Sequence, residues 1–235
     1  MNDISSEIIS TIIKNKISSV EISDALGKKG VLKKLSPLNP NHFSAGLVKY
    51  VPTWSNSNWN LHKEIEDVEE DCIIYVDQIE CSERASVGDI ISHYLFTYKR
   101  IKGLVVNGFV RDSHKLIKEN YPIWCLGSTP LGCDNKNIIA SKDIESILKK
   151  NEKKLSNSIL ICDDSGCTIL EKKLLTKSTL EKLRLIELQE DIWYYCINTL
   201  KWTTYETICL KRYFKEQNLF PENIIEKLNK LRNEF

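Results

Sequence analysis

The sequence predicts an α/β fold, because apolar strands alternate with amphipathic helices through the middle of the chain. The alternating segments are a strand at 72–76, a helix at 89–98, a strand at 104–106, a helix at 113–120 and a strand at 123–126. Strands that are joined through helices run in the same direction, with right-handed crossovers between them. We therefore expect parallel pairing at the centre of the fold.

The composition shows no strong charge preference. The chain has 235 residues, enough for one complete core, and its formal net charge is +1. This balance gives no electrostatic reason to expect nucleic acid or an anionic membrane as a partner. No apolar run approaches the roughly 20 residues of a membrane span, and the first residues lack the regions of a signal peptide. We expect a soluble, cytoplasmic protein that binds neither nucleic acid nor membrane.

Two helices are predicted at the start of the chain. Isoleucines recur at helical spacing over residues 4–17 and define an apolar stripe. Ser18 and Glu21 then have the spacing of a capping box, and Gly27 is suited to end the short helix that the box begins.

The next region is predicted to be irregular. Prolines at 37, 40 and 52 should divide residues 36–57 into short extended pieces, of which 45–48 is the most strand-like. A helix is expected at 58–69, and we interpret the acidic residues around its end as a solvated face. Residues 77–87 should form a loop.

The central helix should begin just after Gly88. Five of its apolar residues recur on one face: Ile90, Ile91, Tyr94, Leu95 and Tyr98. The strand at 104–106 is predicted to turn at Asn107-Gly108 and to expose Arg111 and Asp112 side by side.

These residues could together bind a small anion and a metal ion. Backbone N–H groups at a helix start suit an anion, Arg111 can hold a carboxylate through two parallel bonds, and Asp112 can bind a hard divalent cation. The plainer interpretations are that Asp112 caps the following helix, that Asp89 is a first-turn acid favoured by the helix dipole, and that Arg111 forms a surface ion pair.

The spacing of these residues is that of a known signature. Gly88-Asp89 is followed by residues 108–112, Gly-Phe-Val-Arg-Asp, and residues 23–27 (Ser-Asp-Ala-Leu-Gly) and 127–130 (Gly-Ser-Thr-Pro) flank the pair in the expected order. In these motifs, from about residue 18 to 132, the chain resembles the RraA-like family. That family is named for the regulator of ribonuclease E activity and includes the class II 4-hydroxy-4-methyl-2-oxoglutarate aldolases.

The resemblance implies a fold, an architecture and an assembly. The fold expected is a three-layer β/β/α swivelling domain over residues 1–170. Residues 171–235 would form a helical C-terminal extension that packs on the same domain or on a neighbouring subunit. A homotrimer or a hexamer, with sites near the subunit interfaces, is expected.

The resemblance also implies a divalent-metal-dependent carbon–carbon lyase, an aldolase or decarboxylase acting on a 2-oxo acid through an enolate. Asp112 would be the direct protein ligand of Mg²⁺ or Mn²⁺, and Arg111 would bind the substrate carboxylate and assist catalysis. Asp89 would hold a water coordinated to the ion and transfer a proton through it. Gly88 and the backbone of Ile90 and Ile91 would complete the anion site. The alternative is a non-catalytic regulator that binds a ribonuclease; a methyltransferase is disfavoured because no glycine-rich cofactor turn is present.

The chain also departs from the family pattern. Asp89 and Arg111 are separated by 21 residues, one more than usual, and Asn107 replaces a residue that is often Asp or Tyr. After Cys133 a charged helix at 143–154 is expected instead of a glycine-rich strand pair. An acid from a neighbouring subunit's C-terminal region is implied, but three candidates cannot be distinguished: Glu187, Glu190 and Asp191.

The remainder of the chain carries a strand from 158 with a turn to Gly166, and then helices over 171–233, with Pro221 at a helix start. The aromatic residues from Trp193 to Trp202 are interpreted as packing residues. The eight cysteines include no Cys-x-x-Cys pair, so we expect buried, inert free thiols.

Overall fold

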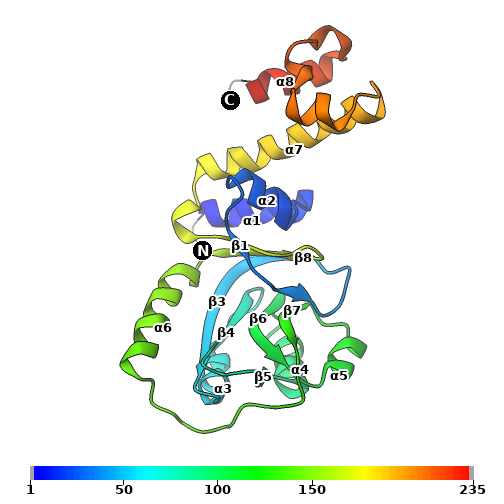
Figure 1. Ribbon diagram of the computed structural model, residues 1–235. Coiled ribbons are helices and arrows are strands. Elements are labelled where there is room, and N and C mark those ends of the chain that lie inside the picture. The colour runs from blue at the N-terminus through cyan, green and yellow to red at the C-terminus, as the bar shows by residue number, and fades with distance from the viewer. Residues whose placement is uncertain (1–2, 233–235) are drawn as a thin grey trace. The chain divides into compact units, whose positions relative to one another are not determined.

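The computed structural model describes residues 3–232, which divide into two compact units, residues 3–176 and 177–232 (Figure 1). The strands of the first unit are β1 (Val31–Leu32), β2 (Ser36–Pro37), β3 (Ser44–Trp54), β4 (Ile73–Ile79), β5 (Ala85–Val87), β6 (Gly103–Val110), β7 (Ile123–Ser128), β8 (Ile159–Asp163) and β9 (Gly166–Leu170). Its α-helices are α1 (Asp3–Asn15), α2 (Ser19–Ala25), α3 (Trp59–Glu64), α4 (Asp89–Thr97), α5 (Ser113–Lys118) and α6 (Lys142–Leu155). The 3₁₀ turns η1 (Ile65–Asp67) and η2 (Lys172–Leu174) complete the unit.

One mixed sheet connects the strands of this unit, in the order β1-β9-β8-β3-β4-β6-β7-β2, with β5 beside β6. The pairs β3–β4, β4–β6 and β6–β7 are parallel, which confirms the pairing expected from the strand–helix alternation. The pairs β3–β8, β8–β9, β1–β9 and β2–β7 are antiparallel. The long strand β3 therefore joins an antiparallel part to a parallel part.

Two apolar cores place these parts in three layers. Along β4, Ile74 and Val76 face a core shared with α3, α4 and α5, while Ile73 and Tyr75 face a second core shared with β8 and β9. This alternation is the period of two expected of a strand that is buried on both faces. The predicted β/β/α layering is confirmed, and Figure 1 shows β8 and α4 on opposite sides of the parallel strands.

The predicted capping box is present at the start of α2. Ser18 Oγ accepts a hydrogen bond from the backbone of Glu21 at 3.2 Å, and the Glu21 carboxylate accepts one from Ser18 N at 2.7 Å. Asp163, at the end of β8, accepts hydrogen bonds from Ser19 N at 2.6 Å and Ser19 Oγ at 2.8 Å. These bonds hold the N-terminal helices on the outer side of the antiparallel strands.

The expectation that Pro52 breaks the chain is wrong, because β3 continues through it to Trp54. At Pro52 the strand pairs with β4 alone, since its pairing with β8 covers only residues 44–47. The Pro52 carbonyl accepts a hydrogen bond from Asn60 Nδ2 at 3.0 Å, so it faces the edge away from β4. A missing N–H on that edge removes no ladder bond.

The predicted turn at Asn107-Gly108 is also wrong, because β6 runs on to Val110 with an irregularity between Val106 and Phe109. The side chain of Gln78 satisfies the displaced backbone: Oε1 accepts from Phe109 N at 2.9 Å and Nε2 donates to Phe109 O at 3.1 Å. A Cβ on Gly108 would lie 1.9 Å from Gln78 Oε1. The glycine is there to admit this side chain rather than to make a turn.

Two smaller expectations need correction. The loop predicted at 77–87 contains the end of β4 and the whole of β5. On α4, Ile91 and Leu95 are buried, but Ile90 is 81% exposed and Tyr98 is 68% exposed. The apolar stripe is therefore narrower than the sequence predicted, and Ile90 is left at the surface beside the start of the helix.

The charged helix expected after Cys133 is confirmed as α6, capped by Ser141 Oγ, which accepts from Ile144 N at 3.3 Å. Its Asn151 donates to Asp77, a buried carboxylate of β4, at 2.9 Å. Asn107 and Tyr50 also donate to Asp77, at 2.8 and 3.0 Å. The residue that departs from the family pattern at 107 thus belongs to a buried polar cluster that ties α6 to the parallel strands.

The second unit is helical, as predicted. It contains α7 (Lys177–Asn198), the π-helical turn η3 (Tyr205–Cys209), the 3₁₀ turns η4 (Arg212–Phe214) and η5 (Gln217–Leu219), and α8 (Glu222–Arg232), which follows Pro221. Trp202 and Tyr213 are buried in its core and Trp193 and Tyr195 are partly buried, in agreement with the packing interpretation, whereas Tyr194 is exposed.

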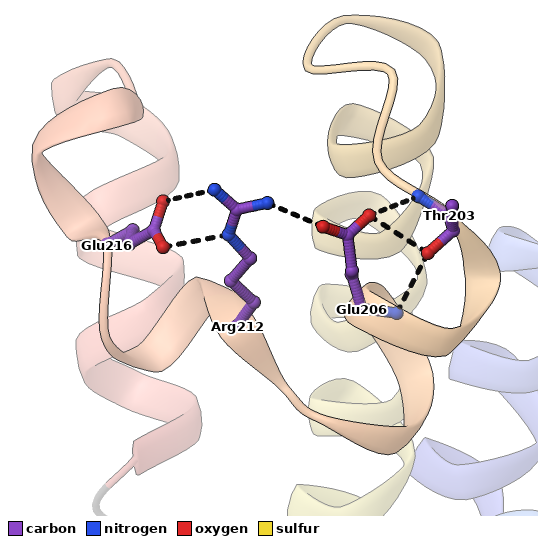
Figure 2. A network of polar contacts seen from close by, with 4 residues as sticks. All are labelled: Thr203, Glu206, Arg212 and Glu216. Carbon is purple, nitrogen blue, oxygen red and sulfur yellow. Dashed lines mark hydrogen bonds and ion pairs between the residues drawn. The ribbon is translucent and has the colours of Figure 1, made fainter.

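A polar network fastens the turns of this unit (Figure 2). Arg212 donates to both oxygens of Glu216, at 2.8 and 2.9 Å, and to Glu206 at 2.6 Å. Glu206 also accepts from Thr203 N and Oγ1, both at 2.9 Å. The Arg212 guanidinium lies 4.6 Å from the centre of the Trp202 ring, so one cation connects the turns to the aromatic core.

The cysteines are free, as expected, but they are not all buried: Cys209 is exposed, and Cys72 and Cys133 are half-buried. Across the described part of the chain, no helix is both long enough and apolar enough to cross a membrane.

Candidate functional site

The signature residues meet where β5 leads into α4. Gly88 follows β5 in an extended conformation, with φ −146°, and α4 begins at Asp89. A Cβ on Gly88 would lie 2.7 Å from Asp112 Oδ2 and 2.9 Å from Arg111 Cγ. Glycine is required here because any side chain would collide with Asp112 and Arg111, and not because the backbone has an unusual φ. The start of α4 can therefore lie directly against the Arg-Asp pair that follows β6.

Asp112 turns its side chain away from its own helix. It stands at the N-cap position of α5 with a left-handed φ of 57°, and its side chain makes no capping hydrogen bond to α5. Instead, Oδ2 accepts a hydrogen bond from the backbone N of Asp89 at 3.2 Å. The interpretation of Asp112 as a simple side-chain cap is wrong, because the left-handed backbone directs the carboxylate towards α4. Such a conformation is sparsely populated for a residue with a side chain.

Arg111 extends along the same wall. Its backbone N–H donates to Val87 O at 2.9 Å, which aligns the end of β6 with β5. Its Nε lies 3.7 Å from Asp112 Oδ2, and a Cβ on Gly132 would lie 2.6 Å from its Nη1. The guanidinium is thus held between two glycines, Gly88 and Gly132, with half of the side-chain surface exposed. Its ion pair is with the neighbouring site carboxylate.

Asp89 is a first-turn acid of α4, as the plainer interpretation expected, and it is also paired across the site. Lys115 Nζ, from the first turn of α5, lies 3.1 Å from Asp89 Oδ2. Sequence reasoning did not identify Lys115. Its position three residues after Asp112, on a helix beginning at the site, is the signal that could have found it. The ion pair joins the first turn of α4 to the first turn of α5.

The six predicted residues line one hollow of about 200 Å³. Its lining is Asn58, His62, Ala85, Ser86, Gly88, Asp89, Ile90, Ile91, Arg111, Asp112, Cys133 and Asn135. The first-turn N–H groups of Ile90 and Ile91 have no partner within α4, so they are available to an anion placed there. A space of this size suits a small organic acid.

Half of the lining was not predicted from sequence. Asn58 and His62 come from the start of α3, and Cys133 and Asn135 from the segment after β7. These two regions meet because Asn58 N donates to Asp134 O at 3.0 Å. No local motif indicates this meeting, since it depends on a backbone pairing between distant segments.

The donor set suits a hard divalent cation held mainly by water and ligand. Among residues 3–232, no group of three or more His, Cys, Asp or Glu side chains could hold a metal ion. Mg²⁺ commonly keeps several waters and uses one or two carboxylates, so Asp112 with Asp89 nearby is a sufficient protein contribution. The contacts of the Asp112 carboxylate with described residues use Oδ2, which leaves Oδ1 to face such an ion.

Comparison with known proteins identifies the family. The chain is 28% identical over 204 residues to protein DlpA of Legionella pneumophila, covering 81% of this chain and 32% of DlpA. It is 32% identical over 109 residues to a Halalkalibacterium halodurans protein named "Putative 4-hydroxy-4-methyl-2-oxoglutarate aldolase", covering 46% of this chain and 51% of that protein. The chain therefore spans about a third and about half of the lengths of these relatives.

The fold and the family model agree with this similarity. A crystal structure of an uncharacterized protein from Pseudomonas syringae pv. tomato has a TM-score of 0.66 with this chain, at 22% identity, covering 88% of this chain and 94% of that one. The model of the RraA-like family, described as Aldolase/RraA, matches residues 19–169. The match takes in α2, every strand of the first unit and the whole of the Gly88–Asp112 site, and the chain therefore belongs to the RraA-like family.

Proposed function

We propose that the protein is a divalent-metal-dependent lyase that cleaves a carbon–carbon bond next to a 2-oxo acid, as an aldolase or a decarboxylase. The observation that carries the proposal is the conformation of Asp112. Its left-handed backbone places the carboxylate against the start of α4 and beside Arg111 rather than on its own helix. A carboxylate that contacts a neighbouring segment instead of capping its own helix is free to take part in binding at that segment.

The chain's residues divide the work of binding. Arg111 receives the substrate carboxylate through its guanidinium fork, and the first-turn N–H groups of Ile90 and Ile91 donate to an anionic oxygen. Asp112 holds the cation through its remaining oxygen. When bound, Mg²⁺ or Mn²⁺ polarises the 2-oxo group and stabilises the negative charge that develops on its oxygen.

The proton transfer is assigned to Asp89, at the start of α4. In oxaloacetate decarboxylation, the bond between C3 and the C4 carboxylate breaks, CO₂ leaves, and the electron pair passes into the enolate of pyruvate. Asp89 positions a water that delivers a proton to C3. Lys115 Nζ, 3.1 Å from Asp89 Oδ2, holds this carboxylate in position for the proton transfer. In aldol cleavage the same carboxylate, through water, accepts the proton of the C4 hydroxyl.

The test is decarboxylation of oxaloacetate and cleavage of 4-hydroxy-4-methyl-2-oxoglutarate by the purified chain, with Mg²⁺ or Mn²⁺ and with chelator. Asp112→Asn keeps the shape of the side chain and removes the charge that holds the cation. Asp67→Asn is the matched control, because Asp67 is an exposed acid on η1 outside the hollow. We expect activity that chelator and Asp112→Asn abolish and Asp67→Asn retains.

Two results would overturn the proposal. Activity that is unchanged in chelator would show that no metal takes part. A folded wild-type protein that turns over neither substrate with either metal would instead favour the alternative of a non-catalytic regulator that binds a ribonuclease. That alternative is then examined by measuring direct binding to the ribonuclease.

A further inference from the structure

Two cysteines meet at the wall of the hollow and have no part in the chemistry proposed above. Cys81 follows the end of β4 and is 2% exposed, whereas Cys133 lies after β7, is half-buried and lines the hollow. The two thiol groups interact with each other. One sulfur of the pair is thus inside the protein and the other faces the site.

The backbone holds these two segments together on both sides of the thiols. Ala85 N donates to Leu131 O at 2.8 Å, and Cys133 N donates to Ala85 O at 2.9 Å. The side chain of Arg84 donates to Gly132 O at 3.0 Å. The two cysteines therefore lie on segments that backbone hydrogen bonds hold side by side.

The pair also shares its proton unequally. The hydrogen bond from Cys133 lowers the pKa of Cys81 to about 7, and the same bond raises the pKa of Cys133 above its ordinary value. The pair as a whole therefore loses one proton near neutral pH. The thiolate is the reactive form of cysteine, and the Cys133 side chain is the member of the pair that lines the hollow.

We propose that Cys81 and Cys133 are a modification site that small hydroperoxides convert reversibly into a disulfide. The Cys133 thiolate attacks the outer peroxide oxygen, the O–O bond breaks, the alcohol or water leaves, and Cys133 becomes a sulfenic acid. Cys81 sulfur then attacks the sulfenic sulfur, forming the S–S bond and releasing water. In total, two thiols are oxidised and one hydroperoxide is reduced to alcohol, or to water, plus one water. A small dithiol reverses the reaction by exchange.

The chain provides a matched control pair. Cys162 and Cys167 are direct partners across β8 and β9, but both lie in the core between the antiparallel and parallel parts of the sheet. Burial raises the pKa of Cys162 well above its ordinary value, and both side chains of this pair are inaccessible. If contact between two thiols were enough, both pairs would oxidise alike. If access from the hollow and an available thiolate are required, only Cys81 and Cys133 should be linked.

Closing the disulfide would also change the site. A sulfur–sulfur bond of about 2.05 Å is shorter than a hydrogen-bonded thiol contact, so the two segments must approach each other. Gly132 precedes Cys133 and lies against the Arg111 guanidinium, where a Cβ would come within 2.6 Å of Nη1. Oxidation should therefore move the wall that supports Arg111.

The test follows the disulfide itself, so its outcome does not depend on the proposed lyase activity. The full chain carrying Cys209→Ser, which removes the exposed thiol, is treated with hydrogen peroxide, alkylated and mapped by non-reducing peptide mass spectrometry. We expect a Cys81–Cys133 linked peptide that disappears on treatment with dithiothreitol, while Cys162 and Cys167 remain reduced. In Cys81→Ser, we expect Cys133 to accumulate a sulfenic acid that dimedone traps.

The contrary outcomes are equally definite. A map in which Cys81 and Cys133 stay reduced under conditions that oxidise Cys72 would overturn the proposal. Linkage of Cys162 to Cys167 at the same rate would show that neither the hollow nor the shared proton confers reactivity. Dimedone labelling that is equal in wild type and in Cys81→Ser would exclude Cys81 as the resolving thiol.

Discussion

Replacing Gly88 by alanine should damage the site more than the fold. The new Cβ would lie 2.7 Å from Asp112 Oδ2 and 2.9 Å from Arg111 Cγ, whereas ordinary contacts begin at 3.4 Å. The carboxylate would have to move by the difference of 0.7 Å and the arginine stem by 0.5 Å. Both groups are half-exposed side chains that can shift, so the strain should be relieved by displacing them rather than by unfolding the chain.

The expected loss follows from that displacement. A misplacement of about 1 Å in a reacting group can lower a rate by about 10²-fold, or about 2.7 kcal/mol of transition-state stabilisation. We therefore expect kcat/KM for oxaloacetate to fall by roughly 10- to 100-fold in Gly88→Ala, with thermal stability close to that of wild type. Steady-state kinetics and thermal unfolding by circular dichroism measure the two quantities on the same preparation.

Gly103→Ala is the matched control. A Cβ at this position meets Ser44 and Trp124 at 3.3 Å, inside the first unit and away from the hollow. It should lower stability modestly and leave kcat/KM nearly unchanged. Wild-type kinetics in a folded Gly88→Ala protein would refute the reasoning, because it would show that the positions of Asp112 and Arg111 beside Gly88 do not determine the reaction.

Three further predictions concern binding, assembly and pH. Arg111→Lys keeps the charge and loses the fork, so kcat/KM and pyruvate affinity should fall by about 1.5–3 kcal/mol, roughly ten- to hundredfold; unchanged pyruvate affinity by calorimetry would make Arg111 structural. Light scattering at micromolar concentration should find a homotrimer or a hexamer, and a strict monomer would contradict this. Hydrogen bonds from Thr203 lower the pKa of Glu206, and those from Arg212 lower the pKa of Glu216. A carboxyl group whose pKa is lower in the folded state than in the unfolded state stabilises the fold above the unfolded-state pKa. This stabilisation is lost as the pH falls through the folded-state pKa. The helical unit should therefore melt more easily below the ordinary value of 4.5, and less so in Arg212→Gln, as followed by circular dichroism.

The local patterns in the sequence were sufficient for much of the first unit. The capping box at Ser18 and Glu21 and the central alternation of strands and helices each depend on residues close together in the chain, and each is present. The motif residues Gly88, Arg111 and Asp112 also lie together in the structure. These features are local or are carried by a strand–helix unit whose geometry is nearly invariant.

The wrong predictions of secondary structure occur where contacts with distant segments override the local sequence pattern. Asn107-Gly108 has the composition of a turn, but Gln78 from β4 bonds to the backbone there and the strand continues. Pro52 has the composition of a break, but β3 has an unpaired edge at that position. The residues around these positions indicate neither the hydrogen bonds from Gln78 nor the point at which the pairing of β8 with β3 ends.

What the sequence by itself determined is the family, the α/β class and the identity of the charged groups. The tertiary structure alone decided the orientation and the contacts of their side chains. Three contacts join segments far apart in the chain: Arg111 with Gly88 and Gly132, Asp89 with Lys115, and Cys81 with Cys133. The left-handed backbone at Asp112 directs its carboxylate into the same region. Their physical basis is close approach of backbones, which depends on the packing of the whole domain and leaves no periodic trace in the sequence.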